Sequence, residues 1–189
     1  MRIISGKYRG TSLYEPLDEH TRPLKDIARE SIFNLLEHSN KFIFKFNYSN
    51  ILDLYSGTGS FGLECLSRNA NHVSFVENKK SAINILEKNI KKLNIEKKTK
   101  VFFSDVFNYL EKQKTSKLEF DLIFCDPPFK NEQVNKLLEL IFDNKILDKN
   151  GILVLHRNKT TKEIFPDYLN IIDERIYGIS KIFFVKFLT

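Results

Sequence analysis

The sequence has no tryptophan, one methionine and two cysteines among its 189 residues. The cysteines, Cys65 and Cys125, both lie in apolar stretches, so we expect two buried free thiols. A disulfide framework or a cysteine metal site is not expected from this pattern, and we predict no metal.

Long apolar runs are also missing. No stretch approaches the roughly 20 apolar residues of a membrane-spanning helix. The first ten residues, MRIISGKYRG, are basic and lack the apolar centre of a signal peptide. Repeats, low-complexity tracts and linkers rich in Pro, Gly or Ser are not found. We therefore expect a cytoplasmic, monomeric protein with a single domain over residues 1–189.

Acidic residues are in the minority. The chain has 30 Lys and Arg against 24 Asp and Glu, a net charge of +6, which favours a polyanionic partner only weakly. Many lysines between residues 79 and 100 fit a solvated helix. Arg2, Lys7 and Arg9 stand in a segment without acids and are candidate contacts for nucleic-acid phosphates. The alternative is a solvated hairpin face.

The first 50 residues differ from the rest of the chain. Residues 2–14 contain short β-like runs broken by Gly6 and Gly10, which predict a small hairpin. A helical pattern follows Pro23, with its apolar residues on one face. Residues 41–48, KFIFKFNY, predict a short extended segment that pads the edge of a sheet; contact with RNA is the alternative.

From residue 50 onward, strand-like runs alternate with helical patterns. Five nearly continuous apolar runs predict parallel strands with helices on both faces, an α/β fold. The last two runs are joined around Gly178 without room for a helix, so they should pair antiparallel. The predicted strands are NILDLY, HVSFVE, KVFFS, FDLIFC and GILVLH, then LNIIDERIY and SKIFFVKF.

A glycine-rich loop follows the first of these strands. Residues 53–62, DLYSGTGSFG, contain the G-x-G-x-x-G pattern of dinucleotide-binding loops. Ligands of parallel sheets bind at such a strand-to-helix turn, and Gly57, Thr58 and Gly59 would let the backbone come close to one. Asp53 decides between cofactors: its carboxylate would repel a pyrophosphate but favour the ammonium and sulfonium of S-adenosylmethionine.

Acids also follow the next two strands. Glu77 ends the second strand, where it can accept hydrogen bonds from two ribose hydroxyls. Asp105 follows the third strand and can accept from an adenine amino group, with the Val106 N–H beside the ring. The alternative is that Asp53 caps the loop and that Glu77 and Asp105 are helix caps. Acids at three successive strand ends favour the cofactor site.

The fourth strand leads into Asp126-Pro127-Pro128-Phe129. Two prolines fix φ twice and remove two N–H donors, so the Pro127 carbonyl is held rigidly. Asp126 and that carbonyl can accept both N–H bonds of an exocyclic amino group and align its nitrogen for methylation. Phe129 can stack on a flipped-out base. A rigid strand-to-helix turn with a surface Phe is the alternative.

These motifs resemble those of a known enzyme class. DLYSGTGS, FVE, SD and DPPF, in this order, resemble class I amino-methyltransferases, whose Rossmann-like sheet has five parallel strands and a C-terminal antiparallel hairpin. MRIISGKYRG, TRPLKDIARESIFNLL and YGISKIFFVKF resemble the RsmD family, which methylates N2 of a guanine in bacterial 16S ribosomal RNA. The resemblance implies S-adenosylmethionine as cofactor and 16S rRNA, within a partly or fully assembled small subunit, as substrate.

The resemblance also implies roles for segments. Residues 1–37 would be an extension that closes on substrate and cofactor, and residues 50–189 the catalytic core. Thr21 to Arg29 would cover the methionine end of the cofactor through Arg22; surface ion pairs of the two arginines with Asp26 and Glu30 are the alternative. The implied cofactor contacts are Asp53, Gly57, Gly59, Glu77 and Asp105, the implied catalytic residues Asp126 to Phe129, and the implied RNA contacts Arg2, Lys7 and Arg9.

Two features depart from the family. The connection over residues 38–49 is longer and more aromatic. His156 and Arg157 end the fifth strand where the family often has an acid, and we interpret His156 as a surface or hydrogen-bonded residue.

Three alternative functions stay open at this point. The DPPF motif permits an adenine-N6 methyltransferase of RNA or DNA, although no separate DNA-recognition domain is visible. The glycine pattern permits an NAD-dependent oxidoreductase, against which Asp53 speaks. The third alternative is an inactive RNA-binding module that keeps the fold. The intact Asp126 speaks against it, because such a module would not need this residue.

Overall fold

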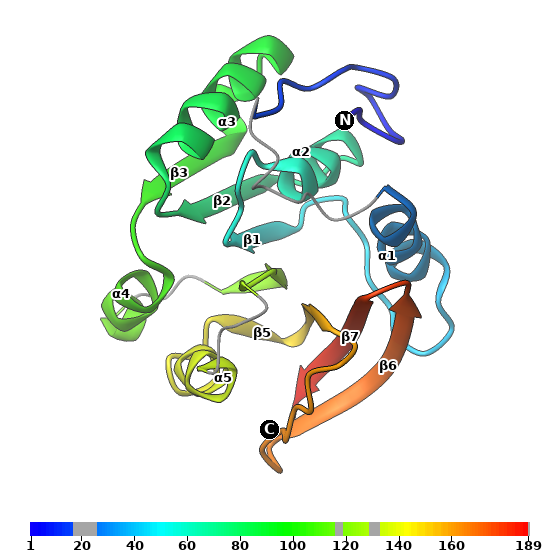
Figure 1. Cartoon of the computed structure of the whole chain (residues 1–189), viewed down its shortest axis with the longest axis vertical. Coiled ribbons are helices and arrows are strands. Elements are labelled where there is room, and N and C mark those ends of the chain that lie inside the picture. Colours follow the sequence, from blue (N-terminus) through cyan, green and yellow to red (C-terminus); the bar gives the residue numbers. More distant parts are fainter. Residues whose placement is uncertain (17–25, 116–118, 129–132, 189) are drawn as a thin grey trace.

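A computed structural model describes residues 1–16, 26–115, 119–128 and 133–188 (Figure 1). Two predicted site residues, Arg22 and Phe129, lie outside these ranges. The helices are α1 (Asp26–His38), α2 (Ser60–Ser67), α3 (Lys80–Leu93), α4 (Val106–Glu111) and α5 (Val134–Asp143), with 3-10 turns at Glu96–Lys98 and Lys112–Thr115. The strands are β1 (Asn50–Leu54), β2 (His72–Glu77), β3 (Thr99–Phe103), β4 (Phe120–Cys125), β5 (Leu147–Asn158), β6 (Leu169–Tyr177) and β7 (Ser180–Phe187).

The seven strands form one sheet in the order β3-β2-β1-β4-β5-β7-β6. Strands β1 to β5 are parallel, whereas β7 pairs antiparallel with both β5 and β6. The predicted α/β fold with a C-terminal antiparallel hairpin is therefore confirmed. The chain moves outward from β1 through β2 to β3, then returns to β4 on the other side. The carboxyl ends of β1 and β4 thus meet at a topological switch point, where such sheets bind ligands.

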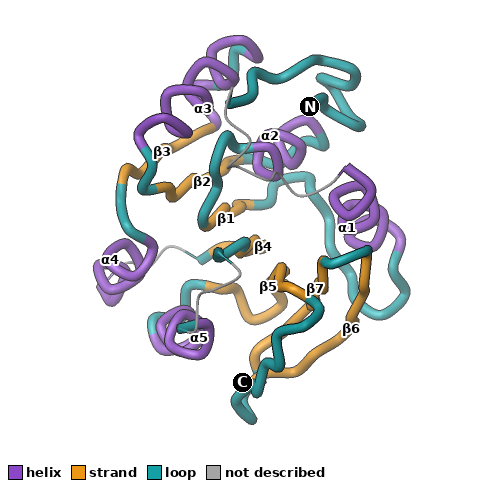
Figure 2. Tube along the Cα trace, viewed as in Figure 1, coloured by secondary structure: helices purple, strands orange, loops and turns teal. Residues whose placement is uncertain are grey.

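Helices cover both faces of the sheet, as Figure 2 shows. The N-terminal hairpin, α1, α2 and α3 pack on one face, and α4 and α5 pack on the other. Successive residues of a strand point to opposite faces, so Ile51 joins the first cluster and Leu52 the second. Burial on both faces explains why the predicted strands read as continuous apolar runs. Cys65 and Cys125 are buried free thiols, as predicted.

Phenylalanine rings connect the first face across several elements. Phe61 of α2 stacks on Phe124 of β4 with 3.9 Å between ring centroids, and on Phe33 of α1 with 4.9 Å. Phe33 in turn contacts Phe46, 5.7 Å away. Residues 41–48 form no strand; they are an irregular segment whose buried Phe42 and Phe46 pack against the core. The padding interpretation is therefore supported.

The predicted N-terminal hairpin is minimal, with one antiparallel bridge between Arg2 and Ser12. Helix α2 holds it in place. The buried Glu64 carboxylate accepts the Ile4 N–H at 2.7 Å and the Ser5 N–H at 2.9 Å, and it also accepts from Arg68 Nε at 2.9 Å. Among the described residues, no helix is long and apolar enough to cross a bilayer.

Candidate active site

The loop between β1 and α2 is shaped by two glycines with different surroundings. Gly57 has φ +55°, and a side chain placed on it would meet no atom within 4 Å. Gly59 has φ +83°, and a Cβ there would lie 2.3 Å from Leu86 Cδ1 of α3. Gly57 therefore leaves room on the open side of the loop, whereas Gly59 lets α2 pack closely on α3. The sequence had assigned both to close approach to a ligand.

Asp53 lies inside the sheet, 1% exposed, one residue before the end of β1. Its Oδ2 accepts the Gly62 N–H at 3.0 Å, so it caps the first turn of α2. Burial raises the pKa of Asp53 well above its ordinary value; the bond from Gly62 lowers it, and the charges of Asp126 and Glu77 raise it further. The capping alternative is thus real, but it leaves a carboxyl whose ionisation is costly without a nearby cation.

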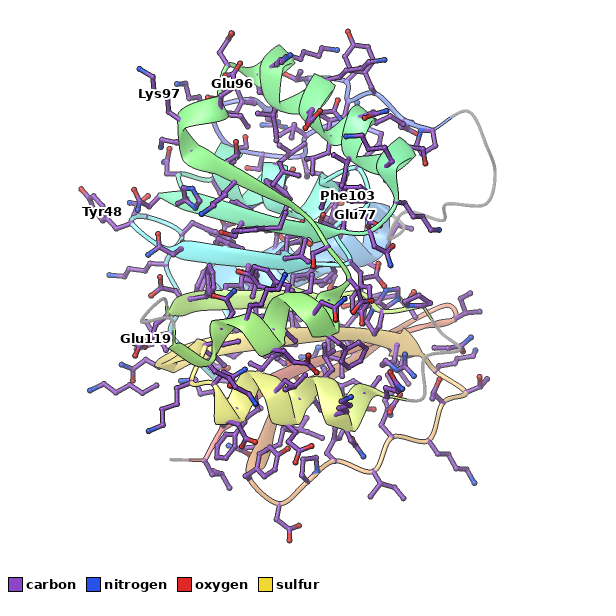
Figure 3. The ribbon with its side chains drawn as sticks, turned by 90° about the vertical axis from the view of Figure 1, so that its left-hand side faces the viewer. Tyr48, Glu77, Glu96, Lys97, Phe103 and Glu119 are labelled. Carbon is purple, nitrogen blue, oxygen red and sulfur yellow. The ribbon has the colours of Figure 1, made fainter. Side chains whose placement is uncertain are left out.

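Glu77 joins the end of β2 to the same loop. Its Oε2 accepts the Gly57 N–H at 2.8 Å, and its Oε1 accepts the N–H groups of Asn78 at 2.9 Å and Lys79 at 2.8 Å. Figure 3 shows Glu77 beside Phe103, its register partner on β3. An oxygen that accepts one bond can accept a second, so Oε2 has the capacity for a hydroxyl donor. Glu77 therefore both fixes the loop and fits a ribose.

Asp105 is the N-cap residue of α4. Its Oδ1 accepts the N–H groups of Phe107 at 2.9 Å and Asn108 at 3.3 Å. The helix-cap alternative therefore holds for this oxygen. The side chain of Val106 is buried in the core on the α4 and α5 face.

Asp126 follows β4 and reaches the surface with 26% of its side chain. Its Oδ1 lies 2.7 Å from Nδ1 of His156, whose side chain is 6% exposed. Pro127 is buried, and the Pro128 carbonyl accepts from Nη1 of Arg157 at 3.4 Å. His156 is thus hydrogen-bonded, one of the two interpretations given to it, and its partner is the candidate catalytic acid.

Acids at the ends of β1, β2 and β4 gather at one edge of the sheet. Asp53, Glu77 and Asp126 are close enough for the charges of the last two to raise the pKa of the first. An added cation would relieve this repulsion, whereas a pyrophosphate would increase it. The residues therefore fit a cofactor with an ammonium and a sulfonium. Among the described residues, no group of acids, histidines and cysteines could hold a metal ion.

The structure describes the hairpin that was predicted to bind RNA, but only the last part of the segment that was predicted to close over the cofactor. Arg2, Lys7 and Arg9 are exposed on the hairpin, where they can meet a partner. Arg29 is fully buried, and its Nη2 donates to the Arg2 carbonyl at 2.9 Å. Arg29 is therefore not at the surface: the residue joins α1 to the hairpin. Most of the predicted closing segment, with Arg22, lies outside the described residues.

Asn89 is a residue that the sequence analysis missed. This fully buried amide of α3 accepts the Tyr14 N–H at 2.7 Å and donates to the carbonyls of Tyr14 at 3.2 Å and Thr58 at 3.4 Å. It thereby joins the N-terminal segment to the glycine loop. A polar residue on the apolar helix face, three positions after Leu86, was the available signal.

The chain is similar in sequence and in fold to known proteins. The family described as Conserved hypothetical protein 95 matches residues 1–186. Haemophilus influenzae Ribosomal RNA small subunit methyltransferase D is 32% identical over 180 residues, which span 95% of this chain and 90% of that protein. The chain belongs to the RsmD family. Bacillus subtilis YlbH is 34% identical over 84% of this chain and 83% of its own.

A solved structure agrees with the family. The crystal structure of HI0767 from Haemophilus influenzae superposes with a TM-score of 0.80 at 29% identity, over 100% of this chain and 98% of that one. The chain is therefore a methyltransferase. This result speaks against the NAD-dependent oxidoreductase that the glycine pattern alone permitted.

Proposed function

We propose that the protein transfers the methyl group of S-adenosylmethionine to the exocyclic N2 of a guanine in 16S rRNA of the small ribosomal subunit. The supporting observation is the position of Asp126: it leaves β4 beside the acid-lined glycine loop, and part of its side chain is accessible. The relative named Ribosomal RNA small subunit methyltransferase D, matched over 95% of this chain, supports the substrate class.

The residues of the site have distinct proposed roles. S-adenosylmethionine supplies an electrophilic methyl group on a sulfonium. Asp53, Glu77 and Asp105 would hold its cationic, ribose and adenine parts, with Gly57, Thr58 and Gly59 forming the loop and Val106 offering its N–H. Each acid already accepts a backbone N–H, so the loop and helix ends stand in place before binding. Such preorganisation lowers the cost of ordering the site.

The D-P-P segment would orient the substrate amine. An amino group attached to a base is a poor nucleophile because its lone pair is delocalised into the ring. Asp126 and the Pro127 carbonyl would accept its two N–H bonds and direct the nitrogen lone pair toward the methyl group, which is catalysis by alignment. Pro127 and Pro128 keep the segment rigid, and Phe129 would stack on the base.

The exposed hairpin would contact the RNA backbone. Arg2, Lys7 and Arg9 carry positive charge on one small element that α2 holds rigidly. Contacts of this kind make affinity fall with salt, and each lost phosphate contact lowers the salt slope by about one. The triple replacement by Ala should flatten the salt dependence of rRNA binding, and an unaltered slope would remove the hairpin from the interface.

Methyl transfer with radiolabelled cofactor tests the proposal. Small subunits and naked 16S rRNA from cells lacking the modification are incubated with wild type or Asp126→Ala, and the nucleosides are then analysed by mass spectrometry. We expect N2-methylguanosine from the wild type only, and normal cofactor affinity in the variant. Transfer by Asp126→Ala at the wild-type rate would refute the role of this residue.

An adenine-N6 methyltransferase is the second candidate, because the DPPF motif does not select the base. N6-methyladenosine in the same assay would establish it and overturn the guanine proposal.

We further infer a cytoplasmic monomer, which sedimentation analysis and cell fractionation test.

A further inference from the structure

His156 contacts the first residue of the D-P-P segment from the neighbouring strand. The parallel register pairs Cys125 of β4 with Leu155 of β5, and one residue further it brings Asp126 beside His156. The imidazole Nδ1 lies 2.7 Å from Asp126 Oδ1. Since the imidazole is almost fully buried and the carboxylate is partly accessible, the contact comes from the protein side of the carboxylate.

A single hydrogen bond matters for this carboxylate. The terminal torsion of an aspartate is broad, so an unheld carboxylate samples many orientations. Nearby acids do not hold it: burial is the main cause of the raised pKa values of Asp53 and of the Cys125 thiol, and the charge of Asp126 raises both further. The contact with His156 Nδ1 places Oδ1 on the protein side of this carboxylate and leaves Oδ2 for a partner.

Arg157 supports the same segment at its other end. Its Nη1 donates to the Pro128 carbonyl at 3.4 Å, and its Nε pairs with Glu163. His156 and Arg157 are successive residues of β5, so their side chains leave the strand on opposite faces. The end of β5 therefore holds residues 126–128 at two points, at the carboxylate and at a backbone carbonyl.

We propose that His156 is a positioning residue for methyl transfer, an inference that rests on the function proposed above. Its Nδ1–H donates to Asp126 Oδ1 and presents Oδ2 to an N–H of the substrate amine. His156 itself touches neither substrate nor cofactor. It acts on the orientation of Asp126, so its loss affects the rate of transfer and leaves cofactor affinity unchanged.

Two variants with amide side chains distinguish this role from a general need for a polar residue at position 156. In His156→Asn, the amide nitrogen is separated from Cα by the same number of bonds as Nδ1, so it can reach Asp126 Oδ1. In His156→Gln, it lies one bond further out, near the place of Nε2. His156→Phe keeps the ring and removes both nitrogens. His38→Asn, at an exposed position of α1, is the matched control.

The variants are compared with wild type under the transfer assay, with melting temperature and cofactor Kd measured alongside. We expect His156→Asn to keep kcat within about threefold, and His156→Gln and His156→Phe to lose up to about 100-fold, the cost of misplacing a reacting group by about 1 Å. Cofactor Kd should stay within about twofold of wild type. If His156→Phe does not fold, the comparison of kcat between His156→Asn and His156→Gln still tests the inference.

Equal kcat values for the Asn and Gln variants would overturn the inference, and so would a loss of cofactor affinity as large as the loss of kcat. Failure of the wild type to transfer methyl groups would instead refute the proposed function. The two failures are therefore distinct. The His38→Asn control should match wild type in kcat and Kd.

Discussion

Removing the Glu64 carboxylate should detach the N-terminal hairpin and destabilise the protein. In Glu64→Ala, the N–H groups of Ile4 and Ser5 and the Arg68 guanidinium all lose an acceptor at once. Removing one partner of a buried ion pair costs about 3–5 kcal/mol. One kcal/mol lowers the Tm of a chain of this size by about 2–4 °C. We therefore expect a Tm lower by about 6–20 °C in differential scanning calorimetry.

The assay includes two comparisons. Glu64→Gln keeps one oxygen acceptor, so its Tm should fall between those of wild type and Glu64→Ala. Glu87→Ala, on an exposed position of α3, should change stability by no more than about 0.5 kcal/mol. A Tm for Glu64→Ala equal to that of Glu87→Ala would refute the reasoning, because the buried carboxylate would then contribute nothing to hairpin docking.

Four further predictions concern the cofactor site and its glycine loop. Asp53→Asn keeps an acceptor for the helix cap and removes the buried charge. Because the pKa of Asp53 is raised in the folded state, the stability of the wild type falls as the pH rises from the ordinary carboxyl pKa toward the raised one. The Tm of the variant relative to wild type should therefore increase over this pH range. The same variant should bind S-adenosylmethionine about tenfold more weakly by calorimetry, and unchanged binding would exclude an electrostatic role. Asn89→Leu should also weaken cofactor binding, because the Thr58 carbonyl loses its donor; an unchanged Kd would make Asn89 purely structural. Gly59→Ala should lower Tm more than Gly57→Ala, because only its Cβ would overlap Leu86; equal melting temperatures would contradict the packing role.

The fold could be predicted from sequence because its signals are local. Strands buried on both faces read as apolar runs, and all seven were located, including the antiparallel pair around Gly178. The segment over residues 41–48 was harder. Its alternating aromatics resemble a strand, but they pack on α1 and β7 without a pairing partner, which only tertiary structure decides.

The sequence could point to those residues of the candidate site that lie at, or just beyond, the carboxyl end of a strand. Asp53, Glu77, Asp105 and Asp126 could be singled out because parallel strands bring their carboxyl ends to one edge. Glu64 and Asn89 were missed, and burial of Arg29 was not foreseen, because a buried polar residue on a helix leaves no periodic signal that names its partner. The partner of His156 follows from the pairing of β4 with β5, which the structure provides.

The position of β7 has a consequence for synthesis of the chain. Strand β7 follows β5 and β6 in the chain, yet it lies between them in the sheet. Until it emerges, β5 is an open edge with buried apolar residues, and β6 has no neighbour with which to pair. Such an edge can pair with other chains. The sheet therefore closes only after β7 has been made, and loss of β7 would leave two other strands without their partner.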